Sequence, residues 1–319
     1  MLKKKIISSI LLVTVLFVVS GMHTSCYREK NVSNEETLTV TDALGREVSV
    51  KKKPQRVAAL LGSLADVWVL SGGSLCAAAE DAWEDFGLER GDAIDLGGAH
   101  SKSLERLISA DPELVIASAS TAADLEMKEP LEAMGIAVIY FDIDDFEDYL
   151  HMLNICTDLT GRKDLYEQNG LALKAQIEQI KAQCAEANMS ERERKVLLLR
   201  AAPNFVKAKG SSGTVLGEML ADMGCVNIAD SDTDLLENLS VEAVIREEPY
   251  RIFVVLMGSN ADAAKASFEK MLKENPAWAT LDAVKNGRLH IMDKSLFHLK
   301  PNARWAEAYG VLYEKLTEK

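Results

Sequence analysis

Two segments that begin 137 residues apart repeat one pattern, and this repeat constrains the fold more than any other feature. The first reads SLERLI at residues 103–108 and reaches Pro112; the second reads SVEAVI at residues 240–245 and reaches Pro249. Each predicts a Ser-capped short helix, a Pro-marked turn and then a buried apolar strand. The repeat therefore predicts two similar lobes, each with one glutamate, Glu105 or Glu242, at the same point.

Strands and helices alternate on both sides of a helical middle segment. Residues 37–50 alternate apolar and polar positions and predict a hairpin. Apolar runs that predict buried strands lie at residues 56–61, 75–79, 114–117, 136–141, 196–199, 252–255 and 288–292. We interpret residues 80–98 as loop and residues 223–228 as the counterpart of residues 134–139. The fold class is α/β, with a largely parallel sheet in each lobe.

The middle of the chain has helical composition. Residues 146–159 predict one helix, which Gly161 ends or kinks, and residues 163–187 predict a second, so the lobes are joined by a long rigid strut. The expected domains are an export signal (1–25), a tether (26–37), an N-terminal lobe (38–145), a helical segment (146–190) and a C-terminal lobe (191–319).

The N-terminus has the pattern of an export signal. Three lysines at residues 3–5 precede an apolar run at residues 6–19, which is short for a membrane-spanning helix. The sequence HTSC at residues 23–26 resembles a lipoprotein signal, which makes Cys26 the lipidated residue. Plain secretion is the alternative. The expected location is therefore outside the cell membrane, anchored to its outer face or periplasmic.

Charge and cysteine content exclude several classes of protein. The formal net charge is −13, and no basic stripe suits a nucleic-acid partner. The cysteines beyond Cys26 are Cys76, Cys156, Cys184 and Cys225. They form no Cys-x-x-Cys pair, so a zinc ribbon is not indicated, and buried thiols are expected. Whether two of them form a disulfide is left open.

Ligands of α/β lobes bind beyond the C-terminal ends of strands. This rule selects candidate ligand-binding residues, which are Leu61, Gly62, Ser63, Ser118, Ser120, Arg200, Asn204, Phe205 and Gly258. Backbone N–H groups and hydroxyls there can bind ligand oxygens, and Arg200 can pair with a carboxylate. Ordinary loop packing is the alternative for each residue.

Several further segments carry a family resemblance, and their order along the chain makes it specific. They are TVTDALGREV at residues 39–48, the two Ser-x-Glu units, NPAW at 275–278, VKNGR at 284–288 and KPNARW at 300–305. From about residue 38 to its end the chain resembles the substrate-binding lipoproteins of ABC importers for iron–siderophore complexes, haem and cobalamin. The resemblance implies two Rossmann-like lobes joined by one rigid helix, with a ligand held in the cleft of a monomer.

The resemblance also assigns residues. It adds Trp83, His100, Phe297 and His298 to the ligand site, where Trp83, Phe205 and Phe297 could cover an organic face. His298 could ligate haem iron or hydrogen-bond a chelator, with a structural role as the cap of the last helix as the alternative. Glu105 and Glu242 match the family's acidic residues that dock against arginines of the permease. The alternative for both is stabilisation of a helix start, worth ~0.3–1 kcal/mol.

The ligand class follows from the scarcity of histidines. With five histidines, one of them in the signal, a cluster that binds bare metal is not expected, and neither is an intrinsic cofactor. A chelated metal is favoured, in the order iron(III)–siderophore, haem, cobalamin; a small oxyanion is also open. No nucleophile elbow, P-loop or His-Glu-x-x-His motif indicates an enzyme. The alternatives from other classes are a chelatase-like enzyme and a surface adhesin.

Overall fold

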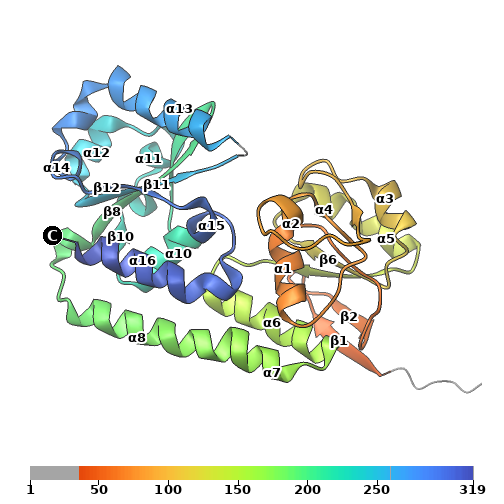
Figure 1. Cartoon of the computed structure of the whole chain (residues 1–319). Coiled ribbons are helices and arrows are strands. Elements are labelled where there is room, and N and C mark those ends of the chain that lie inside the picture. The colour runs from red at the N-terminus through yellow and green to blue at the C-terminus, as the bar shows by residue number, and fades with distance from the viewer. Residues whose placement is uncertain (1–35, 259, 319) are drawn as a thin grey trace, which may run out of the picture. The chain divides into compact units, whose positions relative to one another are not determined.

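The computed structural model describes residues 36–258 and 260–318. An N-terminal sheet has the strand order β5-β4-β3-β6-β7, with all pairings parallel. Its strands are β3 (Val57–Ala59), β4 (Ala77–Ala78), β5 (Ile94–Asp95), β6 (Leu114–Ser118) and β7 (Ala137–Phe141). Helix α1 (Gly62–Leu70) covers one face, and α3 (Leu104–Ser109) and α5 (Lys128–Ala133) cover the other (Figure 1). Because both faces are covered, the strands are continuously apolar, as the sequence predicted.

The predicted hairpin is β1 (Thr37–Thr41) and β2 (Glu47–Lys51), which pair antiparallel. The motif DALGR makes its turn. One oxygen of Asp42, Oδ1, accepts hydrogen bonds from the backbone N–H groups of Leu44 and Arg46, both at 3.0 Å. The Arg46 guanidinium donates to the carbonyl oxygen of Val138 and lies 5.0 Å from the centre of the Tyr140 ring. The motif therefore fastens the hairpin to β7.

A C-terminal sheet has the order β10-β8-β11-β12, with β9 also paired to β8. Its strands are β8 (Lys195–Ala202), β9 (Phe205–Lys209), β10 (Val226–Asn227), β11 (Arg251–Leu256) and β12 (Leu289–Met292). All pairings are parallel except that of β9, which runs antiparallel to β8. Helices α10 (Val215–Asp222) and α16 (Trp305–Thr317) cover one face; α12 (Val241–Glu247) and α13 (Ala261–Glu274) cover the other.

The sheet orders correct one sequence interpretation. Residues 223–228 were matched with residues 134–139, but β10 lies beside β8 on the side away from β11. It thus corresponds to β4, which lies beside β3 on the side away from β6, and the counterpart of β7 is β12. The cause is connectivity: β10 follows the first helix after β8, as β4 follows the first helix after β3.

Several short helices and strands were not predicted from the sequence. Residues 80–98, expected to be loop, contain α2 (Asp81–Glu84) and the edge strand β5. Residues 122–133 form two short helices, α4 (Ala122–Glu126) and α5. Strand β9 was not expected, and β8 runs on to Ala202. Two-residue strands and four-residue helices give too little periodicity to be recognised in a sequence.

The strut contains α6 (Phe146–Thr160), α7 (Lys163–Tyr166), the π-helical turn η1 (Glu167–Leu171) and α8 (Ala172–Glu186). Gly161, at φ 77°, ends α6 as the sequence predicted. A side chain on Gly170 would come within 2.9 Å of the Leu150 side chain, so glycine lets the π-helical turn pack on α6. Helix α8 then runs along α16 (Figure 1).

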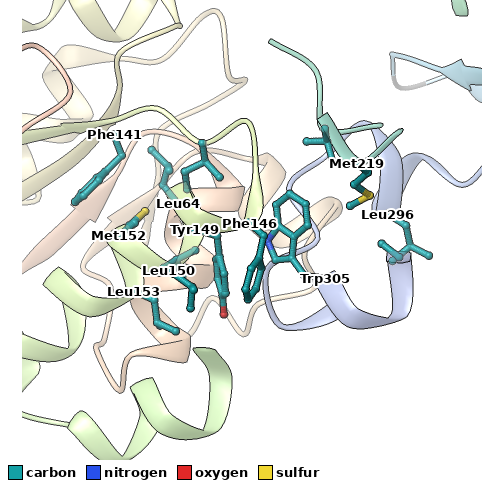
Figure 2. Packing of buried hydrophobic residues seen from close by; sticks show 14 of the residues in the cluster. Leu64, Phe141, Phe146, Tyr149, Leu150, Met152, Leu153, Met219, Leu296 and Trp305 are labelled. Atoms are coloured by element: carbon teal, nitrogen blue, oxygen red, sulfur yellow. The ribbon is translucent and has the colours of Figure 1, made fainter. Parts of the chain in front are cut away.

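One apolar core joins the inner faces of both sheets. It includes Ile116 and Phe141 from the N-terminal sheet and Leu198 and Phe253 from the C-terminal sheet. Figure 2 shows Phe146 and Trp305 in contact range between Leu64 and Phe141 on one side and Met219 and Leu296 on the other; their ring centres are 5.9 Å apart. A shared close-packed core resists large relative movement of the sheets.

The two repeat helices are capped as the sequence predicted. The Ser103 hydroxyl accepts a hydrogen bond from the Arg106 N–H at 3.2 Å, and the Ser240 hydroxyl accepts one from the Ala243 N–H at 3.3 Å. Helices α3 and α12 lie on the sheet faces away from the shared core. The four cysteines in the described part of the chain are free thiols. No described helix is long and apolar enough to cross a membrane.

Candidate functional site

A cavity of about 780 Å³ lies where strand ends of the two sheets face each other. Its volume is within the range of small-molecule sites in proteins. The wall from the N-terminal sheet is formed by Leu61, Ser63, Asp81, Glu84, Asp85, Phe86 and residues 98–101. The wall from the C-terminal sheet is formed by Met257, Gly258, Lys294 and residues 298–300. Five of the sequence-predicted ligand-binding residues meet here: Leu61, Ser63, His100, Gly258 and His298.

Gly62 has a different role from the one predicted. Its backbone N–H, expected to bind a ligand oxygen, donates instead to the Oδ2 atom of Asp81 at 2.9 Å. A Cβ atom on Gly62 would lie 2.6 Å from the backbone nitrogen of Ala82. Glycine is thus required because α2 packs directly on the start of α1. The other oxygen of Asp81, Oδ1, is buried without a partner among the described residues, and burial raises the pKa of this carboxyl.

A buried ion pair holds the loop that carries His100. The Lys102 ammonium lies 2.7 Å from the Asp124 carboxylate, and neither side chain is exposed. Lys102 also donates to the carbonyl oxygen of Ala99, and Asp124 accepts a hydrogen bond from the Ser118 N–H at 2.8 Å. The His100 loop and the end of β6 are therefore linked through one charged pair.

The segment at residues 293–305 forms much of the opposite wall and contacts the N-terminal sheet. Lys294, in α15 (Lys294–Phe297), pairs with Asp85 at 2.9 Å, and Lys300 pairs with Asp144 at 3.2 Å. The buried Asn302, at φ 51°, donates to the carbonyl oxygen of Ser63 at 2.9 Å. The KPNARW motif thus attaches the last helix to α1.

His298 lines the cavity as a neutral imidazole. Burial, reinforced by the charges of Arg200, Lys294 and Lys300, lowers its pKa to about 4. Its Nδ1 atom is buried without a hydrogen-bond partner among the described residues. The backbone of His298 ends α15 and does not cap α16, so the structural role considered for it does not apply in that form.

The other predicted ligand residues lie off the cavity wall. Phe297 is only 2% exposed and packs in the shared core, so its side chain presents almost no surface to the cavity. Trp83 is half-buried against the same core. Ser118 is buried and its hydroxyl lies 3.1 Å from that of Ser120. Arg200 lies within β8, because that strand is longer than expected, and Asn204 and Phe205 lie in the β8–β9 connection and at the start of β9.

Sequence reasoning missed the acidic part of the wall. Asp81 and Asp85 follow the end of β4, so the strand-end rule would have found Asp81 had it been applied there. Lys294 and Lys300 were missed because residues 293–302 carry no periodic pattern. No group of three or more His, Cys, Asp or Glu side chains able to hold a metal ion occurs in residues 36–258 and 260–318.

Glu105 and Glu242 are both exposed on the first turns of their helices. Three residues further along lie Ile108 and Ile245, which are 41% and 39% exposed. Residues three apart share a helix face. Each sheet therefore displays the same acidic and apolar pair.

Comparisons with known proteins agree with this fold. The family model described as "Periplasmic binding protein" matches residues 57–296. The chain is 22% identical, over 81% of its length and 79% of the relative's, to an uncharacterised ABC transporter substrate-binding lipoprotein of Bacillus subtilis, YvrC. A second Bacillus subtilis relative, the putative ABC transporter substrate-binding lipoprotein YhfQ, is 22% identical over 96% of both chains.

Among solved structures, SirA of Staphylococcus aureus in complex with staphyloferrin B superposes with a TM-score of 0.69. The match has 20% identity and covers 88% of this chain and 98% of SirA. At this identity the likeness shows the fold. The family match spans most of the chain, so the protein belongs to the periplasmic binding protein family. This confirms the family resemblance and the two-lobed α/β fold drawn from the sequence.

Proposed function

We propose that the protein captures a chelated metal outside the cell membrane and delivers it to an ABC permease. The observation that carries this proposal is the cavity at the facing strand ends, which brings together Leu61, Ser63 and His100 with Gly258 and His298. Proteins of the same fold support it: SirA has been solved in complex with staphyloferrin B, and RhuT of Roseiflexus is a haem-binding protein.

An iron(III)–siderophore is the first candidate ligand and haem the second; cobalamin follows. The cavity wall is rich in charged side chains, among them Asp81, Asp85, Lys294 and Lys300, which suits a polar chelate better than an apolar ring. The neutral His298 could donate or accept one hydrogen bond to a chelator, or ligate haem iron. We infer that the protein has no intrinsic cofactor and carries out no chemistry on its ligand.

Tryptophan fluorescence tests this function, because Trp83 lies beside Glu84 of the cavity wall. Titration with a ferric siderophore, haemin or cyanocobalamin should quench the signal at one chelate per chain and leave the chelate chemically unchanged. His298→Ala should weaken the binding of the active probe, whereas the exposed His151→Ala is the control. Failure of all three chelates to bind would contradict the proposal.

Docking on the permease would use Glu105 and Glu242. Their position on exposed first turns, each beside an exposed isoleucine, supports two matching patches for a partner that presents basic and apolar groups twice. The helix-start role of the glutamates remains compatible with this, since both lie beside a serine cap. In host cells, Glu105→Ala/Glu242→Ala should reduce uptake while the chelate affinity of the purified protein stays the same.

Anchoring through Cys26 completes the proposal and lies outside the described residues. The named lipoprotein relatives support it. Cys26→Ser should move the protein from the membrane fraction to the soluble exported fraction, and the protein should bind its ligand as a monomer. Retention of Cys26→Ser in the membrane would contradict lipidation at this residue.

A further inference from the structure

Three cations project from one face of the C-terminal sheet. Arg200 on β8 is directly opposite Lys207 on β9, and Lys209 is opposite Leu198. Opposite residues of an antiparallel pair, and residues two apart on one strand, share a face of the sheet. The side chains of Arg200, Lys207 and Lys209 therefore project from the same face.

Within the described part of the chain, none of the three forms an ion pair with an acidic side chain. The ammonium of Lys207 lies 5.7 Å from the centre of the Phe205 ring, which provides no negative charge. Arg200 and Lys209 are half-buried. Burial lowers the pKa of both, and the neighbouring cations lower that of Lys209 further.

This arrangement is costly in the free protein. Like charges directly opposite each other on paired strands destabilise a sheet, and burial adds a desolvation cost. It is also unexpected in a chain with a net charge of −13, in which acidic partners are plentiful. A bound anion would remove the cost.

Arg200 is next to the cavity, because Met257 of the cavity wall donates its backbone N–H to the carbonyl oxygen of the neighbouring Ala201 at 2.9 Å. After burial, the charge of Arg200 is the strongest influence on the pKa of His298, which forms part of the cavity wall. Two further cations, Lys294 and Lys300, lie on that wall and are already paired with Asp85 and Asp144. Unlike these two lysines, Arg200, Lys207 and Lys209 have charges that a bound anion could neutralise.

We propose that Arg200, Lys207 and Lys209 form the anion-binding end of the ligand site, and that the transported ligand is a ferric chelate with several free carboxylates. This rests on the proposed function and narrows it: a polycarboxylate chelate is favoured, and a neutral corrinoid or a cationic hydroxamate chelate is disfavoured. Arg200 supplies a planar fork for one carboxylate, and the two lysines supply point charges for others.

The test compares Lys207→Gln/Lys209→Gln with a control of equal charge change, Lys273→Gln/Lys285→Gln, on exposed helical positions. Ferric citrate and the cationic ferrioxamine B are the probes, measured by fluorescence titration at low and high salt. We expect the wild type to bind ferric citrate, the first variant to bind it roughly tenfold or more weakly, and the control to be unchanged. A preference for ferrioxamine B, or equal binding by both variants, would overturn the inference.

Failure of both ferric probes to bind would count against the proposed function itself. Thermal stability tests the anion site separately, without a ferric probe. In low salt without ligand, Lys207→Gln should have a higher Tm than the wild type, because it removes the repulsion with Arg200. Iron-free citrate should raise the Tm of the wild type more than that of Lys207→Gln/Lys209→Gln. An unchanged or lower Tm for Lys207→Gln, or an equal effect of inorganic phosphate and citrate, would refute a polycarboxylate site.

Discussion

The two sheets carry matching outer helices and different inner edges. On the outside, α3 and α12 share a serine cap, an exposed glutamate and an exposed isoleucine. At the cavity, the wall on the side of the N-terminal sheet carries the acidic Asp81 and Asp85, whereas the wall on the side of the C-terminal sheet carries Lys294 and Lys300. The difference fits the proposal that the repeated surface contacts a partner with two matching sites, whereas the surfaces that differ contact one asymmetric ligand.

The contrast extends to the residue before each serine cap. In the N-terminal copy it is Lys102, buried in its ion pair with Asp124; in the C-terminal copy it is Leu239, which packs against the apolar core of that side. Leu239 adopts φ 47° there. The same position of the repeat is thus a charged residue in one copy and an apolar residue in the other. Only Lys102 holds a loop of the cavity wall.

The largest expected effect comes from removing this difference. Lys102→Leu should destabilise the protein by about 3–5 kcal/mol, because it leaves Asp124 buried without a counter-charge. Lys102→Leu/Asp124→Leu should recover much of the loss, which chemical denaturation would measure. If the single and double variants were equally unstable, the pair would not be the cause.

The second effect concerns His298 and depends on pH. The pKa of His298 is lowered to about 4 in the folded protein from an ordinary value of 6.5. Between these values the unfolded chain binds a proton that the folded protein does not, so stability falls as pH falls below about 6.5. The loss should be about 2 kcal/mol at pH 5.

His298→Gln removes this titration, so its denaturation curve should lose part of the pH dependence between pH 7 and pH 5. His151→Gln, at an exposed position, is the control and should keep the wild-type profile. An identical pH profile for His298→Gln and the wild type would show that His298 is not held neutral by its surroundings.

The outer surfaces should show the third effect. Glu105→Ala/Glu242→Ala should lower uptake by roughly tenfold, as expected for the loss of charge pairs at an interface, while each single variant has a smaller effect. Glu126→Ala/Glu274→Ala, at exposed helical positions, controls for the change in charge. Equal uptake by the two double variants would show that Glu105 and Glu242 do not dock on the permease.

The smallest effect is expected at the ion pairs across the cavity rim. The Lys294–Asp85 pair is partly exposed, so Lys294→Ala should change the free energy of unfolding by only about 0–1 kcal/mol. A double-mutant cycle with Asp85→Ala would give the coupling. A coupling well above this range would mean that the rim pair, and not the shared core, fixes the spacing of the two walls.

The sequence was sufficient for features that recur over many residues. The repeat around Ser103 and Ser240 and the long α6 could be predicted because periodicity and capping are local properties. The site was less predictable. Gly62 is determined by the approach of α2, and the burial of Phe297 by the way residues 293–302 fold back onto α1. Both depend on tertiary packing between segments far apart in the chain.

The order of the strands within each sheet could not be predicted from the sequence either. Residues 223–228 and 134–139 look alike locally, yet β10 and β7 occupy different places in their sheets. Similar apolar runs after a glycine specify a strand but not its neighbours, which depend on the preceding connection.

Native mass spectrometry of the protein purified from its own host would show directly whether it captures a carboxylate-rich metal chelate. We expect one intact chelate per chain, with metal and organic part together and the organic part rich in carboxylates. We also expect this chelate to be absent from Lys207→Gln/Lys209→Gln prepared in the same way. A bare metal ion, a chemically altered ligand, or a chain that takes up no chelate when one is supplied would contradict this expectation.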